Sequence, residues 1–257
     1  MNRTNIFTIA VAVAAALIPA CATDSSTSTP GSDELAGENG QDGESAKADA
    51  AHDEFGFMAV KKDGAFNCNT LNCTTYSLTR VNRTTVLCID GQYHASCTVK
   101  GVDFSALSQA TQTKVTDALQ REAADPTIGT HVLVKGAFKN NVDFVTFQAT
   151  EVWLAQRQVG STDGTFVRIF DNGVRCITAP CPTLTEERVN SNRSSGIEGL
   201  DFGITAKNTL EDAFERGLYA ATSTADGLIL AGNRTTQPSG ASSEKLRTVD
   251  QAFLRVH

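Results

Sequence analysis

Residues 176–190, CITAPCPTLTEERVN, repeat the pattern of residues 68–82, CNTLNCTTYSLTRVN. In both stretches two cysteines enclose four residues, and a Val-Asn pair follows after seven further residues, at a constant separation of 108 positions. A pattern that recurs at a fixed separation indicates an internal repeat. It predicts a folded part built from two homologous units.

The similarity extends beyond these stretches in both directions. Upstream, FMAVKKDGAFNC (57–68) matches FVRIFDNGVRC (166–176), and each copy contains a turn dipeptide, Asp-Gly or Asn-Gly. Downstream, GVDF (101–104) matches GLDF (199–202), with ten residues fewer in between. The first copy has the extra segment, which would contain both Cys88 and Cys97 and which we expect to be a hairpin around Asp90-Gly91. We therefore place repeat unit 1 at residues 55–158 and repeat unit 2 at residues 159–257.

The hydrophobic pattern of each unit predicts strands, one helix and two further strands. Apolar residues recur at helical spacing on the predicted helix 105–122, which Ser105 would cap, and again on its counterpart, where Gly217 is a stop signal. These residues are Leu107, Ala110, Val115, Ala118 and Leu119 in unit 1, and Leu210, Phe214 and Leu218 in unit 2.

A hairpin through Asn140-Asn141 is expected to close unit 1, with one strand ending at Gly136 in this unit and at Gly232 in the other. Its second arm alternates, which predicts one core face and one wet face. The core face would contain Val145, Phe147, Ala149 and Trp153. In unit 2 residues 233–245 are polar and predict a long loop. The fold class is therefore α+β and β-rich, each unit being an antiparallel sheet with one helix or an OB-like, partly open barrel.

The N-terminus has the layout of an export signal. Arg3 precedes an apolar run over residues 6–18, which is too short for the roughly 20 residues that a membrane-spanning helix needs. Ala20 then stands directly before Cys21, and a small residue before a cysteine at this place resembles the lipobox of bacterial lipoproteins. The resemblance implies a signal peptide over residues 1–20 and a lipid anchor on Cys21.

The same resemblance bears on localisation. Ala22, where an Asp would favour retention in the inner membrane, favours the outer membrane of a bacterial cell envelope. Ile18 and Pro19 depart from the commonest lipobox. The alternative is an ordinary secretory signal followed by an unrelated cysteine.

Residues 21–54 are expected to form the lipid anchor and a disordered acidic linker. From residue 22 to residue 54 there are nine Asp and Glu residues and one Lys, a net charge of −8. The whole chain has a net charge of −7 and Arg3 contributes +1, so residues 55–257 sum to zero. A polar, self-repelling segment cannot bury enough apolar surface to fold. A neutral folded part without basic runs among aromatics also argues against nucleic-acid binding.

The cysteines suit an exported protein. There are seven, and six remain once Cys21 is assigned to lipid. Their spacing predicts three local disulfides, which are Cys68–Cys73, Cys88–Cys97 and Cys176–Cys181. Zinc is the competing use, but histidines are few and the compartment is oxidising. A redox dithiol would have a shorter spacing. We expect no metal and no cofactor.

The two Cys-x4-Cys motifs, the Val-Asn pairs, the Gly-hydrophobic-Asp-Phe motifs and the late glycines together resemble a domain of unknown function. That domain occurs in secreted lipoproteins of myxobacteria and related bacteria. The resemblance covers residues 55–257 and implies no activity and no site residues.

Candidates for catalysis are few. His52 lies in the linker and His257 is the last residue of the sequence, whereas His94 and His131 fall in unit 1 and are expected at the surface. A Ser/His/Asp triad through either is the alternative, but the motifs of zinc proteases, serine hydrolases and P-loop enzymes are absent. The remaining candidates are expected to cap or turn the chain: Asp103, Asp201, Asn82 and Asn190.

Two classes of function remain. The favoured one is a non-enzymatic, envelope-tethered lipoprotein that binds an envelope protein, a glycan or a small ligand, or that stabilises a surface assembly. A variant is a protease inhibitor, because Pro180 and Pro182 would stiffen a loop inside the Cys176–Cys181 ring. The other class is an extracytoplasmic hydrolase with an unrecognised site.

Overall fold

The computed structural model describes residues 56–63, 75–125, 129–140, 145–156, 164–203, 209–239 and 242–257. All of them belong to one compact unit, Glu44–His257. The predicted anchor at Cys21, the linker, and the pair Cys68 and Cys73 lie outside the described residues.

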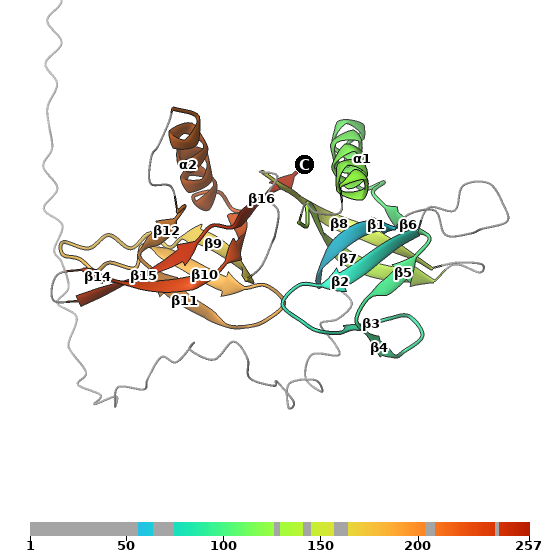
Figure 1. Ribbon diagram of the computed structural model, residues 1–257, viewed down its shortest axis with the longest axis horizontal. Coiled ribbons are helices and arrows are strands. Elements are labelled where there is room, and N and C mark those ends of the chain that lie inside the picture. The colour runs from blue at the N-terminus through green and yellow to red at the C-terminus, as the bar shows by residue number, and fades with distance from the viewer. Residues whose placement is uncertain are drawn as a thin grey trace, which may run out of the picture. The chain divides into compact units, whose positions relative to one another are not determined.

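The first half of the chain contains eight strands and one helix among the described residues: β1 (Phe57–Asp63), β2 (Thr75–Arg80), β3 (Val86–Leu87), β4 (Tyr93–His94), β5 (Cys97–Val99), β6 (Gly101–Asp103), α1 (Gln109–Ala124), β7 (Val132–Asn140) and β8 (Val145–Ala155). The second half contains β9 (Thr165–Asp171), β10 (Leu184–Arg188), β11 (Ser194–Ile197), β12 (Gly199–Asp201), α2 (Thr209–Thr222), β13 (Leu228–Gly232), β14 (Arg234–Ser239), β15 (Ser242–Thr248) and β16 (Gln251–Val256). Figure 1 labels these elements.

One large sheet connects the two halves. Its order is β11-β10-β9-β13-β16-β8-β7-β1-β2-β5, with β6 added in parallel to β8. Strands β12, β15 and β14 form a separate sheet, and β3 pairs with β4. The order from the centre outward is the same in each half, because β8-β7-β1-β2-β5 has the connectivity of β16-β13-β9-β10-β11. The sheet is open, so the OB-like barrel was the wrong alternative and the helix on an antiparallel sheet was the right one.

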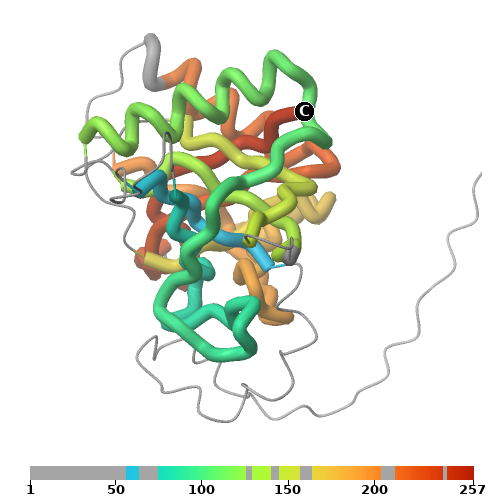
Figure 2. The backbone as a smooth tube through the Cα atoms, turned by 90° about the vertical axis from the view of Figure 1, so that its right-hand side faces the viewer, coloured from blue at the N-terminus to red at the C-terminus, as the bar shows by residue number. Residues whose placement is uncertain are grey.

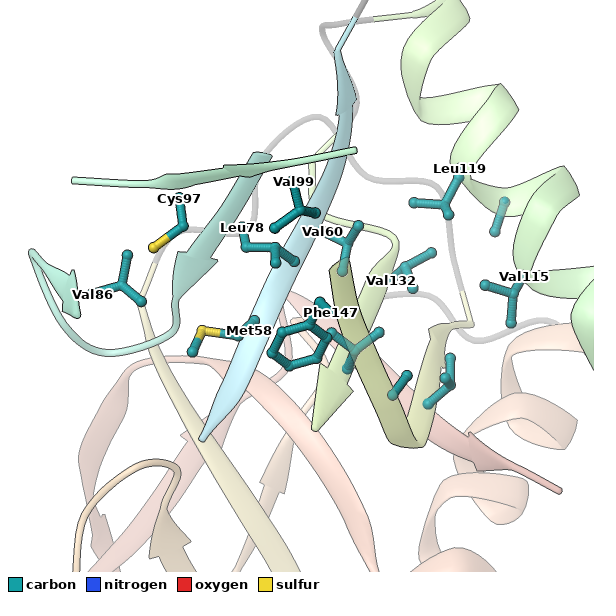
Figure 3. Close-up of a cluster of buried hydrophobic side chains, with 14 residues drawn as sticks. Met58, Val60, Leu78, Val86, Cys97, Val99, Val115, Leu119, Val132 and Phe147 are labelled. Carbon is teal, nitrogen blue, oxygen red and sulfur yellow. The ribbon is translucent and has the colours of Figure 1, made fainter. Parts of the chain in front are cut away.

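The strands bury apolar side chains on both faces of the sheet. Alternate residues of β7 show this, since Val132 and Val134 pack with α1, whereas Leu133 packs on the opposite face. Figure 3 shows the cluster under α1, with Phe147 among Met58, Val60 and Val132. A second cluster lies under α2. Figure 1 shows both helices on the same side of the sheet.

The third cluster occupies the other face and contains side chains from both halves. It consists of Val81, Leu133, Trp153, Phe166, Val189, Ile229, Ala231 and Phe253, all less than 10% exposed. Fully burying an aliphatic or aromatic side chain contributes about 1.5–3 kcal/mol. A cluster of this size therefore ties the halves into one folding unit.

The halves meet at the centre of the sheet through β8 and β16. Leu154 pairs with Leu254, while Phe253 pairs with Ala155 and Arg255 pairs with Trp153. Trp153 and Phe253 hold matching positions in TEVWLA (150–155) and DQAFLR (250–255). The register is thus symmetric about the Leu154–Leu254 pair.

Two asparagines join the halves a second time, through reciprocal hydrogen bonds. Asn82 Nδ2 donates to Phe166 O (2.7 Å) and Val189 O (2.9 Å), and Phe166 N donates to Asn82 Oδ1 (2.8 Å). Asn190 makes the matching set in the other direction. Its Nδ2 donates to Phe57 O (2.8 Å) and Val81 O (3.0 Å), and its Oδ1 accepts from Phe57 N (2.7 Å).

Both asparagines adopt the left-handed conformation, with φ of 59°. Asn tolerates this region better than other residues with a side chain, because its amide bonds to nearby backbone. Here the amide instead satisfies backbone groups of the other half. The predicted role of Asn82 and Asn190 as turn formers is confirmed, and the sequence did not show their partners.

A β-bulge on the hairpin of β7 and β8 reverses the expected alternation. The register shifts between Lys135 and Gly136, which leaves Thr150 as the extra residue of β8. A Cβ on Gly136 would lie 2.0 Å from Gln148 O, so only glycine fits. Trp153 consequently faces the third cluster instead of sharing a face with Phe147, and β7 continues to Asn140 instead of ending at Gly136.

Gly232 shows the same constraint, since a Cβ there would lie 1.9 Å from Thr248 O. Beyond it the chain continues as β14 and returns as β15. The prediction of a long loop at residues 233–245 was therefore wrong. The sequence did not predict this hairpin because residues 233–245 are polar, and Leu246 and Arg247 alone do not establish an alternating pattern.

The helices also differ from expectation in detail. Helix α1 begins at Gln109, and Ser108 caps it by accepting a hydrogen bond from Thr111 N (3.3 Å), so Ser105 is not the cap. Val115, Ala118 and Leu119 are buried as expected, whereas Ala110 is exposed. Gly217 lies inside α2, which ends at Thr222.

We predict that Asn82→Ala or Asn190→Ala lowers the free energy of unfolding by about 3 kcal/mol. Each change removes three hydrogen bonds. It also places alanine at a positive φ, where no side-chain amide compensates for the steric cost of the Cβ. Urea unfolding measures the loss. Asn82→Gly keeps the backbone conformation accessible and should lose less. The exposed Asn192→Ala is the control, with a change within about 0.5 kcal/mol. Equal stability of Asn82→Ala and Asn192→Ala would contradict a stabilising role of the hydrogen bonds that Asn82 makes to the other half.

Candidate functional site

The strongest candidate for a binding site is the β9–β10 loop, residues 172–183. It contains Cys176 and Cys181, whose sulfur atoms lie at disulfide distance with 5.7 Å between the Cα atoms. Residues 172–180 are all exposed. Exposed loops on a rigid scaffold are common places for binding residues.

Several contacts besides the disulfide hold this loop. Asn172 N donates to Thr183 O (3.1 Å), and Asn172 Nδ2 donates to Pro182 O (2.8 Å), which together close its base. Arg175 forms a forked pair with Asp171 through Nη2–Oδ2 (2.6 Å) and Nη1–Oδ1 (3.0 Å). The Arg175 pair and the hydrogen bond from Gly173 N lower the pKa of Asp171 to about 2. Asn172-Gly173 therefore belongs to a wide, braced loop and not to a tight hairpin turn.

The tip of the loop presents an aliphatic side chain to solvent. Ile177 is 104% exposed and Val174 is 44% exposed. Aliphatic side chains are normally covered in the folded state. Ile177 is therefore fully accessible at the tip of a loop whose ends are held.

A second braced projection is the β3–β4 hairpin. The sulfur atoms of Cys88 and Cys97 lie at disulfide distance, in the predicted pairing. Ile89 is 40% exposed and Tyr93 is 49% exposed. Figure 2 shows the hairpin standing out from the sheet on the side away from α1.

The extra segment of the first half contains fewer residues than the sequence comparison indicated, because it includes Cys88 but not Cys97. Cys97 lies on β5, which pairs with β2 in the way that β11 pairs with β10. Its counterpart by strand register is Ser195, because Leu78 pairs with Cys97 and Glu186 pairs with Ser195. Cys97 therefore lies on β5, a strand that has a counterpart, β11, in the second half. Only Cys88 lies in the extra hairpin.

The two candidate catalytic histidines have different surroundings. His94 is exposed, and its Nε2 lies 2.8 Å from Asp90 Oδ2 within the hairpin. His131 is only 4% exposed, which corrects the expectation of a surface position. Its Nδ1 contacts Gly129 O (2.6 Å), and its buried Nε2 has no hydrogen-bond partner among the described residues. Among the described residues, the contacts of these two rings are to Asp90 and Gly129 and not to a hydroxyl or thiol nucleophile.

The remaining candidates have structural roles. Asp103 Oδ1 accepts from Ser105 N (2.8 Å), and Asp201 Oδ1 accepts from Gly203 N (2.9 Å). These bonds close turns after β6 and β12, and the hydrogen bonds from Ser105 lower the pKa of Asp103. His257 lies 3.0 Å from Asp226, and His52 is outside the described residues.

A buried charged group escaped the sequence prediction. Glu186, Arg234 and Arg247 form ion pairs on β10, β14 and β15, with N–O distances of 2.8–2.9 Å. The signal that could have revealed it is the comparison of the two units, because an apolar residue stands at each corresponding position of the first unit. The search for catalytic sequence motifs could not detect this group, because its members lie far apart in the chain.

Among the described residues no group of three or more potential metal ligands was found. Within the same residues no helix is long and apolar enough to span a membrane.

Comparison with known proteins places the chain in a family. Residues 57–257 match DUF6748, a domain of unknown function. The chain belongs to the DUF6748 family. The match agrees with the expectation of a domain of unknown function, and it treats both halves as a single domain. No curated protein and no solved structure matches this DUF6748 chain.

We predict a pH dependence that originates at Glu122 of the DUF6748 domain. Burial raises the pKa of Glu122 to about 7, partly opposed by the hydrogen bond from His131 N and by Lys61. The folded state thus binds this proton more tightly than the unfolded state. The contribution of Glu122 to stability is largest below its unfolded pKa, falls as pH rises towards 7, and is constant above that.

Urea unfolding of the wild type and Glu122→Gln between pH 4 and 8 measures this effect. Other titrating groups are common to both proteins, so their difference isolates Glu122. The variant should gain stability over the wild type by on the order of 2 kcal/mol between pH 4 and pH 8. A difference independent of pH would contradict the raised pKa.

Proposed function

We propose that this protein is a non-enzymatic, lipid-anchored binding module of the bacterial cell envelope. In this proposal it recognises an envelope protein through the β9–β10 loop. The single observation that supports it is the fully exposed Ile177 at the tip of a loop held by a disulfide, a forked ion pair and an asparagine amide.

The chemistry of the loop favours a protein partner. Ile177 and Val174 offer aliphatic surface, and the neighbouring Asp171 carboxylate is already paired with Arg175 and so is less available for sugar hydroxyls. A concave apolar pocket on a protein complements such a side chain. Because the loop is already braced, binding would lose little conformational entropy.

The N-terminal sequence supports the proposed anchor and tether. Ala20-Cys21 after an apolar run fits a lipidated cysteine, and Ala22 supports a place in the outer membrane. The acidic, polar linker of 33 residues would have an r.m.s. span on the order of 30 Å. That span would hold the binding module away from the membrane surface.

We also propose that the two halves arose as homologous copies of one unit. Matching motifs at separations of 108 and 98 residues support this, as do the symmetric β8–β16 register and the reciprocal asparagines. A duplicated domain leaves each half free to acquire its own surface features.

A photo-crosslinking amino acid at position 177 tests the recognition loop in native cells. We expect a discrete adduct at least about tenfold stronger than from the exposed position 114 on α1, which corresponds to about 1.4 kcal/mol. A double Cys176→Ser and Cys181→Ser variant and a Pro180→Gly variant should weaken the adduct, because each loosens the loop. Equal labelling at positions 177 and 114 would overturn the proposal.

Intact mass spectrometry of protein extracted from native membranes tests the anchor separately. We expect a mass that begins at a triacylated Cys21, and six thiols that become available only after reduction. An unlipidated chain would exclude the anchor without affecting the loop. Free thiols at Cys176 and Cys181 would exclude the braced ring.

A protease inhibitor is the second candidate, because Ile177 also resembles the exposed side chain that such loops insert into a specificity pocket. Assays of secreted proteases with the wild type and Ile177→Asp separate the candidates. Inhibition that the substitution abolishes would favour the inhibitor, and uncleaved, non-inhibitory binding would favour the module.

A further inference from the structure

The buried charged group of the second half consists of Glu186, Ser195, Arg234 and Arg247. Glu186 and Arg247 are 3% and 4% exposed. Glu186 Oε2 accepts from Arg247 Nε and Nη2, both at 2.9 Å. Glu186 Oε1 accepts from Arg234 Nη2 (2.8 Å) and from Ser195 Oγ (3.2 Å). Arg247 Nη1 donates to Gly232 O (3.0 Å).

Strand register assigns each of these positions a counterpart in the first half. Arg234 pairs with Arg247 as Phe138 pairs with Phe147. Glu186 pairs with Ile169 as Leu78 pairs with Val60. The four correspondences are Glu186 to Leu78, Ser195 to Cys97, Arg234 to Phe138 and Arg247 to Phe147.

The counterparts form ordinary apolar core. Leu78 and Phe147 are fully buried, and Phe138 meets Phe147 edge to face with 5.2 Å between ring centroids. Figure 3 shows Leu78, Cys97 and Phe147 within this cluster. The framework is thus complete with apolar side chains at all four positions.

Charges at such positions need a reason other than stability. Desolvating an ion pair costs several kcal/mol per ion, and well-packed apolar residues often replace buried pairs without loss. The first half shows that replacement within the same framework. We infer that the second half keeps its charges for a ligand.

The group has an excess of one positive charge, because two guanidinium groups face one carboxylate. Arg247 uses Nε, Nη1 and Nη2 within the protein. Arg234 Nε, in contrast, is buried without a hydrogen-bond partner among the described residues. A buried donor left unpaired destabilises the folded state, and more so when it is charged.

We propose that the group formed by Glu186, Ser195, Arg234 and Arg247 binds a carboxylate, with Arg234 as the contacting residue. One carboxylate neutralises the excess charge, and one of its oxygens can accept from Arg234 Nε, because Arg234 Nη2 already donates to Glu186 and Ser195. Glu186 and Arg247 hold the Arg234 guanidinium in place. This site is separate from the β9–β10 loop and does not depend on the function proposed for it.

Acetate is the probe for this site. The NMR signal of the Arg234 Nε–H, assigned by its loss in Arg234→Met, is followed while acetate replaces chloride at constant ionic strength. We expect a saturable shift with acetate, and binding at least about tenfold weaker in Arg234→Met when thermal stabilisation is the readout. The exposed Arg216→Met on α2 is the matched control and should bind acetate like the wild type. No saturation, or equal stabilisation of Arg234→Met, would overturn the proposal.

A triple variant tests whether the framework needs the charges. Glu186→Leu, Arg234→Phe and Arg247→Phe together install the pattern of the first half. We expect it to fold with a melting temperature at or above that of the wild type and to lose the acetate response. A triple variant that fails to fold, or that still responds to acetate, would overturn the inference. Tighter binding of sulfate or phosphate than of acetate would overturn the choice of ligand.

Discussion

The reciprocal hydrogen bonds of Asn82 and Asn190 are the constraint on which the rest of the structure depends. Each amide satisfies three backbone groups at the strand ends of the opposite half. Phe57 O and Phe166 O also accept from Val81 N and Val189 N of their own half, so the amides complete the pairing of backbone groups at the edge of an apolar cluster, where an orphaned backbone group is costly. With the central β8–β16 ladder, the two asparagines fix the halves at two places, so that both halves can bury one shared core.

In this arrangement the buried clusters that hold the strands are separate from the exposed β9–β10 loop. The shared cluster and the two helix-covered clusters hold the strands, and β9 and β10 are among the strands so held. The loop that joins them can therefore expose Ile177 while its ends stay fixed. The same framework accepts either an apolar group around Phe147 or a charged group around Arg247 at corresponding positions. The first half thus fills these positions with apolar core residues, and the second half fills them with charged ones.

Much of the secondary structure was predictable because its causes are local. Asn82 and Asn190 follow valines at strand ends, and the spacing of Val115, Ala118 and Leu119 identifies the buried face of α1. Errors arose where a contact between distant residues decided the result. Gly136 was taken as a strand end, but the close approach of Gln148 O makes it a bulge, and that bulge sends Trp153 to the opposite face.

The sequence by itself determined the repeated motif, the turns at Asn82 and Asn190, the buried face of α1, the cysteine spacing and the acidity of residues 22–54. These depend on neighbours within a few residues or on composition. Only the tertiary structure decided that the halves share a core, that the amides of Asn82 and Asn190 bond across it, and that Glu186 meets Arg234 and Arg247. Each of these contacts joins residues far apart in the chain, and their pairing follows from sheet order and register, which local periodicity does not contain.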